Sequence, residues 1–266
     1  MTRHRFAATV AAGIAFLGLL PHSATFAAGL FSDLADGEVS ASVAAGGIVD
    51  GGGSVGSTGP AVIRSGGPNG DGNAGGNTYN NVVLPFQLPS LGAVAAPFTG
   101  ATFTAFSAGG DNIFGSANMD LYGLGVRTSP TILGSDFYLG GAPDTTDAIL
   151  IQDNYRGTVG GSSPADGTAF STNATGDAAL LAYLNVQYAS GANAGNYVFL
   201  RVSPDNTDIF FKYQSFHAAD DANAAVRPVI TYTAAVVVPE TGALPLLLMG
   251  LGSLPLGIAL RRRLAH

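Results

Sequence analysis

The chain has 266 residues, of which 11% are charged, and its formal net charge is −7. All 18 acidic residues but only six basic ones lie between residues 29 and 240, so this part carries a net charge of −12. A surface of this sign repels phosphate, so we expect no nucleic-acid partner, and the lack of cysteine excludes disulfides and thiolate metal sites.

Residues 1–28 have the pattern of a secretory signal peptide. Arg3 and Arg5 precede an apolar run, Phe6–Leu20, and small residues follow as far as Ala27 and Ala28. The run has about 15 residues where a membrane span needs roughly 20, which disfavours the alternative of an uncleaved anchor. We predict export, with cleavage near Ala27 or Ala28.

Residues 29–59 form a glycine-rich segment in which Glu38–Ala44 is a β-prone piece between glycine clusters; Ala61–Arg64 is a second such piece beyond it. A flexible linker is one interpretation, because glycine loses much backbone entropy on folding. We favour the other, which is edge strands joined by long loops.

Residues 60–235 are predicted to form an antiparallel β-sandwich. Val82–Leu88 is too rich in apolar residues for alternation, which suits a strand buried on both faces. Ala101–Ala108 alternates, with Phe103 and Ala105 on one face. Further short strands between glycine or proline breaks are expected at 118–128, 135–141, 196–205, 207–216 and 226–234.

One helix is expected within this sandwich. Asp177 is the predicted N-cap, and Gly191 the predicted stop. Leu180, Leu184 and Tyr188 follow a four-residue spacing, so one face of the helix is apolar. We expect this face to pack on the sandwich rather than to span a membrane.

After the helix come a strand at Tyr197–Arg201, a second with Phe210 and Phe211, and a closing strand at Arg227–Tyr232. This order resembles the DNRLRE-type, family-96-like carbohydrate-binding domains of exported bacterial proteins. The likeness covers roughly residues 60–233 and implies an all-β, jelly-roll-like sandwich. Those domains carry a Ser-Arg-Glu-like motif where this chain has Ser215–Ala218.

The chain ends in an uncharged segment, Ala243–Leu260, followed by Arg261, Arg262 and Arg263. As a helix the segment spans about 27 Å, close to the thickness of a bilayer core. Positive residues next to a membrane helix stay on the cytoplasmic side. The apolar segment and the three arginines therefore predict a C-terminal transmembrane helix with the preceding domain outside. Burial of the segment in a soluble core is rejected, since three arginines directly follow it.

Val238, Pro239, Glu240 and Thr241 precede this helix, and residues 236–266 as a whole resemble the PEP-CTERM sorting signal of Gram-negative bacteria. That signal combines a short Pro-Glu-Pro motif, a membrane helix and an arginine cluster; Thr241 stands where the second proline is usual. The resemblance implies membrane targeting, an exosortase-type processing protease, and a final location at the cell surface or in the extracellular matrix.

No catalytic site is expected. His217 is the single histidine between the leader and the tail, whereas a zinc site needs three or four ligands, so we expect a structural residue at the surface or at a strand end. A Ser-His-Asp triad from His217, Asp220 and one of many serines is disfavoured, because no Gly-x-Ser-x-Gly nucleophile elbow is expected. Four aspartates are clustered in turn-like settings: Asp136, Asp144, Asp147 and Asp153. Turn capping is a better explanation for them than a glycoside-hydrolase site. The protein is therefore predicted not to be an enzyme.

Calcium is the one ion for which the sequence offers candidates. Asn69, Asp71 and Asn73 alternate along a glycine-rich loop, and Asp205 and Asp208 form a second candidate. The bidentate glutamate of calcium loops is missing, so plain turn chemistry is the alternative.

Two functions compete on these grounds. The leading hypothesis is an exported cell-surface or matrix protein with a structural or adhesive role. The alternative is a carbohydrate-binding module for extracellular polysaccharide, in which exposed tyrosines such as Tyr138, Tyr155 and Tyr213 hold the glycan. A polysaccharide-active enzyme is a third, unsupported hypothesis.

Overall fold

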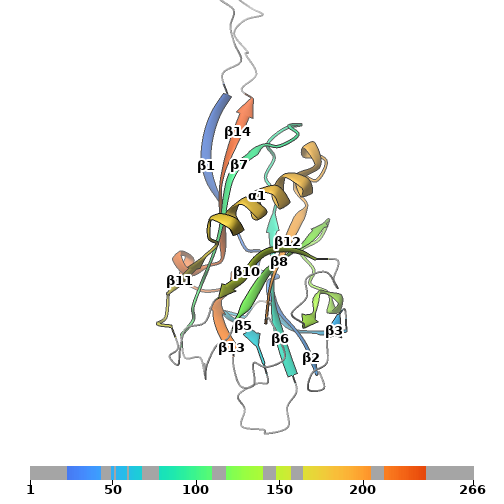
Figure 1. The fold of residues 1–266 in the computed structure, drawn as a ribbon, viewed down its shortest axis with the longest axis vertical. Helices are drawn as coiled ribbons and strands as arrows, with labels where there is room; N and C mark the ends of the chain where they lie inside the picture. The colour runs from blue at the N-terminus through green and yellow to red at the C-terminus, as the bar shows by residue number, and fades with distance from the viewer. Residues whose placement is uncertain are drawn as a thin grey trace, which may run out of the picture. The chain divides into compact units, whose positions relative to one another are not determined.

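Antiparallel strands make up most of the structure, a computed structural model shown in Figure 1. It describes residues 23–42, 49–50, 52–58, 60–67, 78–109, 118–139, 148–156, 164–204 and 213–237. Thr25–Val236 forms one compact unit. The predicted class, an all-β fold with one short packed helix, is confirmed for this part of the chain.

The first sheet joins the two ends of the compact unit. It contains β1 (Ser23–Phe31), β14 (Val229–Val237), β7 (Phe98–Phe106) and β11 (Ala169–Ser171), in that order. β14 runs antiparallel to β7, with Ile230 opposite Phe103. Figure 1 shows the start of β1 beside the end of β14.

The second sheet is larger. Its strands are β2 (Gly37–Ser42), β4 (Ser54–Thr58), β5 (Val62–Gly66), β6 (Thr78–Gln87), β8 (Met119–Arg127), β10 (Ile149–Arg156), β12 (Tyr197–Pro204) and β13 (Tyr213–His217). Six of them follow the order β10-β8-β12-β6-β2-β4, and β5 pairs with both β6 and β13. β2 and β6 pair along their length, so this sheet continues across the predicted boundary at residue 60.

Shorter elements complete the described part of the chain. They are β3 (Val49–Asp50) paired with β9 (Tyr138–Leu139), the helix α1 (Ala174–Tyr188), and three 3-10 turns, η1 (Gly134–Asp136), η3 (Ala189–Gly191) and η4 (Ala224–Val226).

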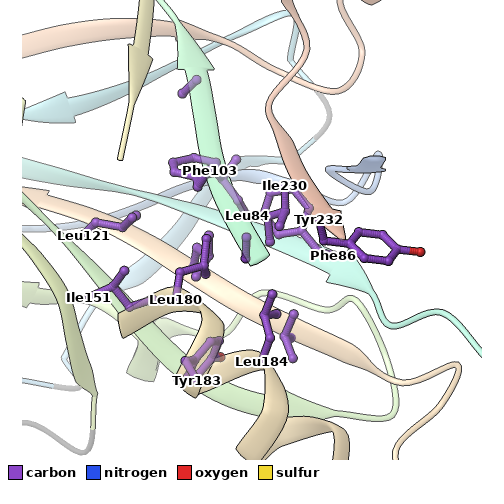
Figure 2. Close-up of a cluster of buried hydrophobic side chains, with 14 of the residues drawn as sticks. Leu84, Phe86, Phe103, Leu121, Ile151, Leu180, Tyr183, Leu184, Ile230 and Tyr232 are labelled. Carbon is purple, nitrogen blue, oxygen red and sulfur yellow. The ribbon is translucent and has the colours of Figure 1, made fainter. Parts of the chain in front are cut away.

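The main hydrophobic core lies between the two sheets and the helix (Figure 2). The first sheet contributes Phe103 and Ile230, and α1 contributes Leu180 and Leu184. The second sheet contributes Leu84, Phe86, Leu121 and Ile151. As the sequence predicts, Phe103 and Ala105 of β7 are buried, while Thr102, Thr104 and Phe106 alternate with them and face outward.

A second, smaller cluster covers the other face of the larger sheet. It contains Val39, Tyr79, Val83, Ile132, Phe137 and Phe199. Val83 belongs to this cluster, whereas its neighbours Val82 and Leu84 belong to the main core. Burial on both faces therefore explains the dense apolar run at Val82–Leu88, as the sequence predicts.

The helix begins earlier than expected. Asn173 is the N-cap, and its side chain accepts hydrogen bonds from the backbone N–H groups of Thr175 and Gly176. The predicted cap, Asp177, lies inside the first turn instead. At the other end Ala189 adopts a left-handed conformation with a φ of 48°, before the predicted stop at Gly191. The buried face predicted from Leu180, Leu184 and Tyr188 is confirmed.

β1, β10 and β11 lie where the sequence predicts no strand. β1 includes the last residues of the predicted leader, up to Ala28. β10 contains register shifts on both sides of Gln152, and Asn154 within it has a φ of 53°. These irregularities break the period of two, which is why the sequence pattern does not reveal β10.

No helix among the described residues is long and apolar enough to cross a membrane. The predicted transmembrane segment, Ala243–Leu260, lies outside those residues.

Candidate functional site

His217 lies at the end of β13 between two carboxylates. Its Nδ1 lies 2.7 Å from Oδ2 of Asp221, and its Nε2 lies 2.8 Å from Oδ1 of Asp166. The Asp166 side chain is 74% exposed, whereas that of Asp221 is 17% exposed. Because a carboxylate only accepts, both bonds form together only when both ring nitrogens carry hydrogen.

The turn after β13 fixes the position of Asp221. Its Oδ1 accepts a hydrogen bond from the Asn223 backbone N–H at 2.7 Å. The Arg227 guanidinium donates to the Asp221 carbonyl at 2.7 and 2.9 Å. The Asn223 N–H lowers the pKa of the Asp221 carboxyl most, and the hydrogen bond and charge of His217 lower it further. Asp221 is therefore a charged partner for His217 at neutral pH.

Asp36 contacts the same segment from the N-terminal side of the chain. Its Oδ2 accepts from the Ala219 backbone N–H at 2.8 Å and from the Ser32 hydroxyl at 3.0 Å. The residue is fully buried, and burial raises the pKa of its carboxyl to about 7; nearby Asp220 and Asp33 raise it further. Through these hydrogen bonds Asp36 links the segment before β2 to the residues after β13.

This arrangement does not form a catalytic triad. Asp221, not the predicted Asp220, is the partner of His217, and both ring nitrogens face carboxylates. The expectation that no nucleophile-elbow pattern occurs is wrong, because residues 52–56 read Gly-Gly-Ser-Val-Gly. Ser54 nevertheless begins the edge strand β4 rather than a strand-to-helix turn. His217 at a strand end agrees with the structural role predicted for it.

The described part of the chain contains no group of three or more histidine or acidic residues placed to hold a metal ion. The predicted calcium residues lie outside that part: Asn69, Asp71, Asn73, Asp205 and Asp208. So do the predicted sorting and topology residues: Val238, Pro239, Glu240, Thr241, Arg261, Arg262 and Arg263.

A second charged cluster lies on the face of the larger sheet that the smaller hydrophobic cluster covers. The Arg201 guanidinium lies 4.9 Å from the Tyr122 ring centre and 5.1 Å from that of Tyr138. It donates to the Asp136 backbone carbonyl at 3.0 Å, while the Asp136 carboxylate binds Arg127. Arg201 is buried, so these contacts offset the cost of removing its charge from water.

Asp136 also confirms the predicted turn-capping role, because its carboxylate accepts the Leu133 N–H at 2.9 Å. The hydrogen bond from buried Arg201 to the Asp136 backbone carbonyl is not predicted from the sequence. One signal was available in the sequence: Arg201 lies between the apolar residues Leu200 and Val202 of β12. A guanidinium that is buried in such a strand requires hydrogen-bond partners.

The tyrosines expected to hold a glycan are not exposed, so this prediction is wrong. Tyr138 and Tyr155 are buried, and Tyr213 is half-buried with the Arg64 guanidinium 5.3 Å from its ring centre. The Tyr155 hydroxyl donates to the Phe170 carbonyl at 2.6 Å. Packing against core partners therefore occupies Tyr138 and Tyr155.

Comparison of the chain with models of known protein families finds no match, and comparison with curated protein sequences finds none either. The resemblances to a carbohydrate-binding domain and to a sorting signal therefore rest on the residues quoted for them.

Proposed function

We propose that the protein is exported and sorted by its C-terminal signal to the cell surface or extracellular matrix of a Gram-negative bacterium, where it has a structural or adhesive role. One observation carries the proposal: Val238–Thr241, the apolar Ala243–Leu260 and Arg261–Arg263 follow directly after the last strand of the sandwich. That order matches the parts of a PEP-CTERM signal.

The fold supports the proposal because its core is complete before the tail begins. The compact unit ends at Val236, so loss of the tail by processing leaves the strands of both sheets in place. Leader cleavage after Ala27 would remove the start of β1, including Phe26, whose ring centre lies 6.0 Å from that of Tyr232. It keeps Ala28 and Leu30, which pack against the main core. A jelly-roll sandwich of the carbohydrate-binding type is the finer fold that we propose for this unit.

The location is tested by expressing the full chain in a Gram-negative host and separating cytosol, membrane and surface fractions. We expect the wild-type chain in the membrane or at the surface, accessible to protease added outside the inner membrane. Replacing Arg261–Arg263 with glutamate removes the residues that hold the tail inside, so protease accessibility or membrane retention is lost. Replacing them with lysine is the matched control and preserves both. Wild-type protein found soluble in the cytosol contradicts the proposal.

Carbohydrate binding is the second candidate function. It is favoured by an uncharged, hydroxyl-rich face of the smaller sheet, and we expect saturable binding of the purified protein to one bacterial polysaccharide of a panel. Turnover of any member of the panel would instead favour an enzyme.

A further inference from the structure

The outer face of the four-stranded sheet carries a group of exposed and half-buried hydroxyl residues, which we call the hydroxyl face. Along β7 and β14 the residues that alternate with core residues point away from the core. The hydroxyl face consists of Thr99, Thr102, Thr104, Ser171, Thr231 and Thr233.

The register of three neighbouring strands brings these hydroxyls together. Thr231 of β14 lies opposite Thr102 of β7, and Ser171 of β11 lies opposite Thr104. The Thr104 and Ser171 hydroxyl oxygens are 2.9 Å apart, as are those of Thr99 and Thr233, and both pairs are exposed. Adjacent strands are about 4.8 Å apart, so the hydroxyls of neighbouring strands lie in regularly spaced rows.

Among the described residues of β7, β11 and β14, none that faces outward is charged, although the protein as a whole is acidic. The other outward residues described on β7, β11 and β14 are also uncharged: Gly100, Phe106, Ala169, Val229 and Ala235. A phosphate or an acidic polysaccharide needs cationic side chains, which these strands do not offer. A metal ion needs carboxylates or histidines, which they also lack. The chemistry that remains favourable is that of a neutral, hydroxyl-rich ligand.

Threonine suits such a ligand in two ways. Its hydroxyl both donates and accepts hydrogen bonds, as sugar hydroxyls do, and its methyl group contacts the apolar C–H edges of a sugar ring. Each contact is weak because it replaces a bond to water, so affinity depends on several contacts along an extended chain.

We propose that the hydroxyl face is a binding surface for a neutral, linear polysaccharide. This inference rests on the second candidate function and assigns it a place in the fold and a ligand class. The competing explanation is that threonine occurs here only because it favours β-strands. Valine shares that preference and the shape of threonine but lacks the hydroxyl, so replacing threonine by valine separates the two explanations.

The test measures binding of the full chain, in mild detergent, to cellulose and curdlan as neutral glucans and to alginate as an acidic polysaccharide. We expect wild type to bind at least one neutral glucan and not alginate. The double variant Thr102→Val, Thr231→Val should bind about tenfold more weakly with an unchanged melting temperature. The matched control, Thr128→Val with Thr175→Val, removes two hydroxyls elsewhere and should bind as wild type does.

If the first double variant does not fold, Thr99→Val with Thr233→Val removes a different hydroxyl pair on the same face. Equal binding by wild type and the folded variant overturns the proposal, and so does preference for alginate or absence of binding to both glucans. The measurement uses purified protein, so its failure is distinct from a failure of the proposed export, which fractionation measures.

Discussion

Asp36 and Asp221 contact the same short segment after β13, yet the environment changes the pKa of their carboxyl groups in opposite directions. Asp36 is buried and its pKa rises to about 7, whereas backbone and histidine donors lower the pKa of Asp221. The two residues therefore contribute to stability over different ranges of pH.

For Asp36 the folded-state pKa lies above the unfolded value of about 4, so the folded protein binds the extra proton between these values. Its contribution to stability is complete below pH 4 and is lost as pH rises through 7. Asp36→Asn keeps an acceptor for Ala219 and cannot ionise. We expect the free energy of unfolding of this variant to rise relative to wild type by at most about 4 kcal/mol from pH 4 to pH 8, measured by urea denaturation.

Asp221→Asn is the control for this prediction, and its effect has the opposite sign. The lowered pKa of Asp221 gives stability that is present above pH 4 and lost as pH falls below it. The variant should be destabilised at pH 7, by about 1–2 kcal/mol, and approach wild type as the pH falls below 4. A constant difference between Asp36→Asn and wild type over pH 4–8 would show that Asp36 is ionised throughout.

At the scale of the elements, periodic strands could be predicted from the sequence, and their exceptions depend on contacts between distant residues. β7 alternates as expected because one face meets the core and the other meets solvent. The start of α1 could not be assigned, because Asn173 and Asp177 are both good caps, four residues apart. The choice depends on Gln152 of β10, whose side chain accepts the Asn173 N–H at 2.8 Å.

The contacts of the candidate site could likewise be predicted from the sequence only in part. A single histidine at a strand end indicates a structural residue, and that much could be predicted. One of its partners, Asp166, lies 51 positions away in the chain, and no sequence pattern relates the two. Asp36 and Ala219 are 183 positions apart. Such pairs are set by sheet topology, which a single sequence does not reveal.

The N-cap assignment makes a direct prediction. Asn173→Ala removes the acceptor for two backbone N–H groups and should lower the free energy of unfolding by about 1 kcal/mol. Thr175→Ala, at an exposed position of the same turn, should change it by much less. Chemical denaturation of the two variants decides the matter, and a larger effect for Thr175→Ala contradicts the assigned cap.

Packing of α1 on the larger sheet depends on a glycine. A Cβ at Gly123 of β8 would lie 2.5 Å from the Tyr183 ring, so Gly123→Ala should cost about 1–3 kcal/mol by displacing that ring. At Gly56, in the edge strand β4, the nearest atom to an added Cβ is 3.4 Å away. Gly56→Ala is therefore the matched control. Thermal unfolding that ranks the two variants in the reverse order would contradict this packing.

At the scale of the whole molecule, the larger sheet is covered on both faces, and the smaller sheet presents its hydroxyl face outward. The chain enters and leaves the compact unit through neighbouring strands of that smaller sheet. The strands of both sheets stay in place without the tail, whereas removal of the predicted leader would take away the first residues of β1. The layout also leaves the uncharged outer face of the smaller sheet open.

The intact mass of the native protein tests the central claim, export with processing at the ends of the chain, most directly. We expect the protein recovered from the surface or matrix to begin near Ala28 or Gly29, and to lack the arginine cluster if an exosortase-type protease has acted. Retention of the cluster on membrane-bound, leader-free protein would identify the tail as a permanent anchor. A full-length chain of 266 residues and 26.7 kDa, free in the cytosol with both ends intact, would contradict the account.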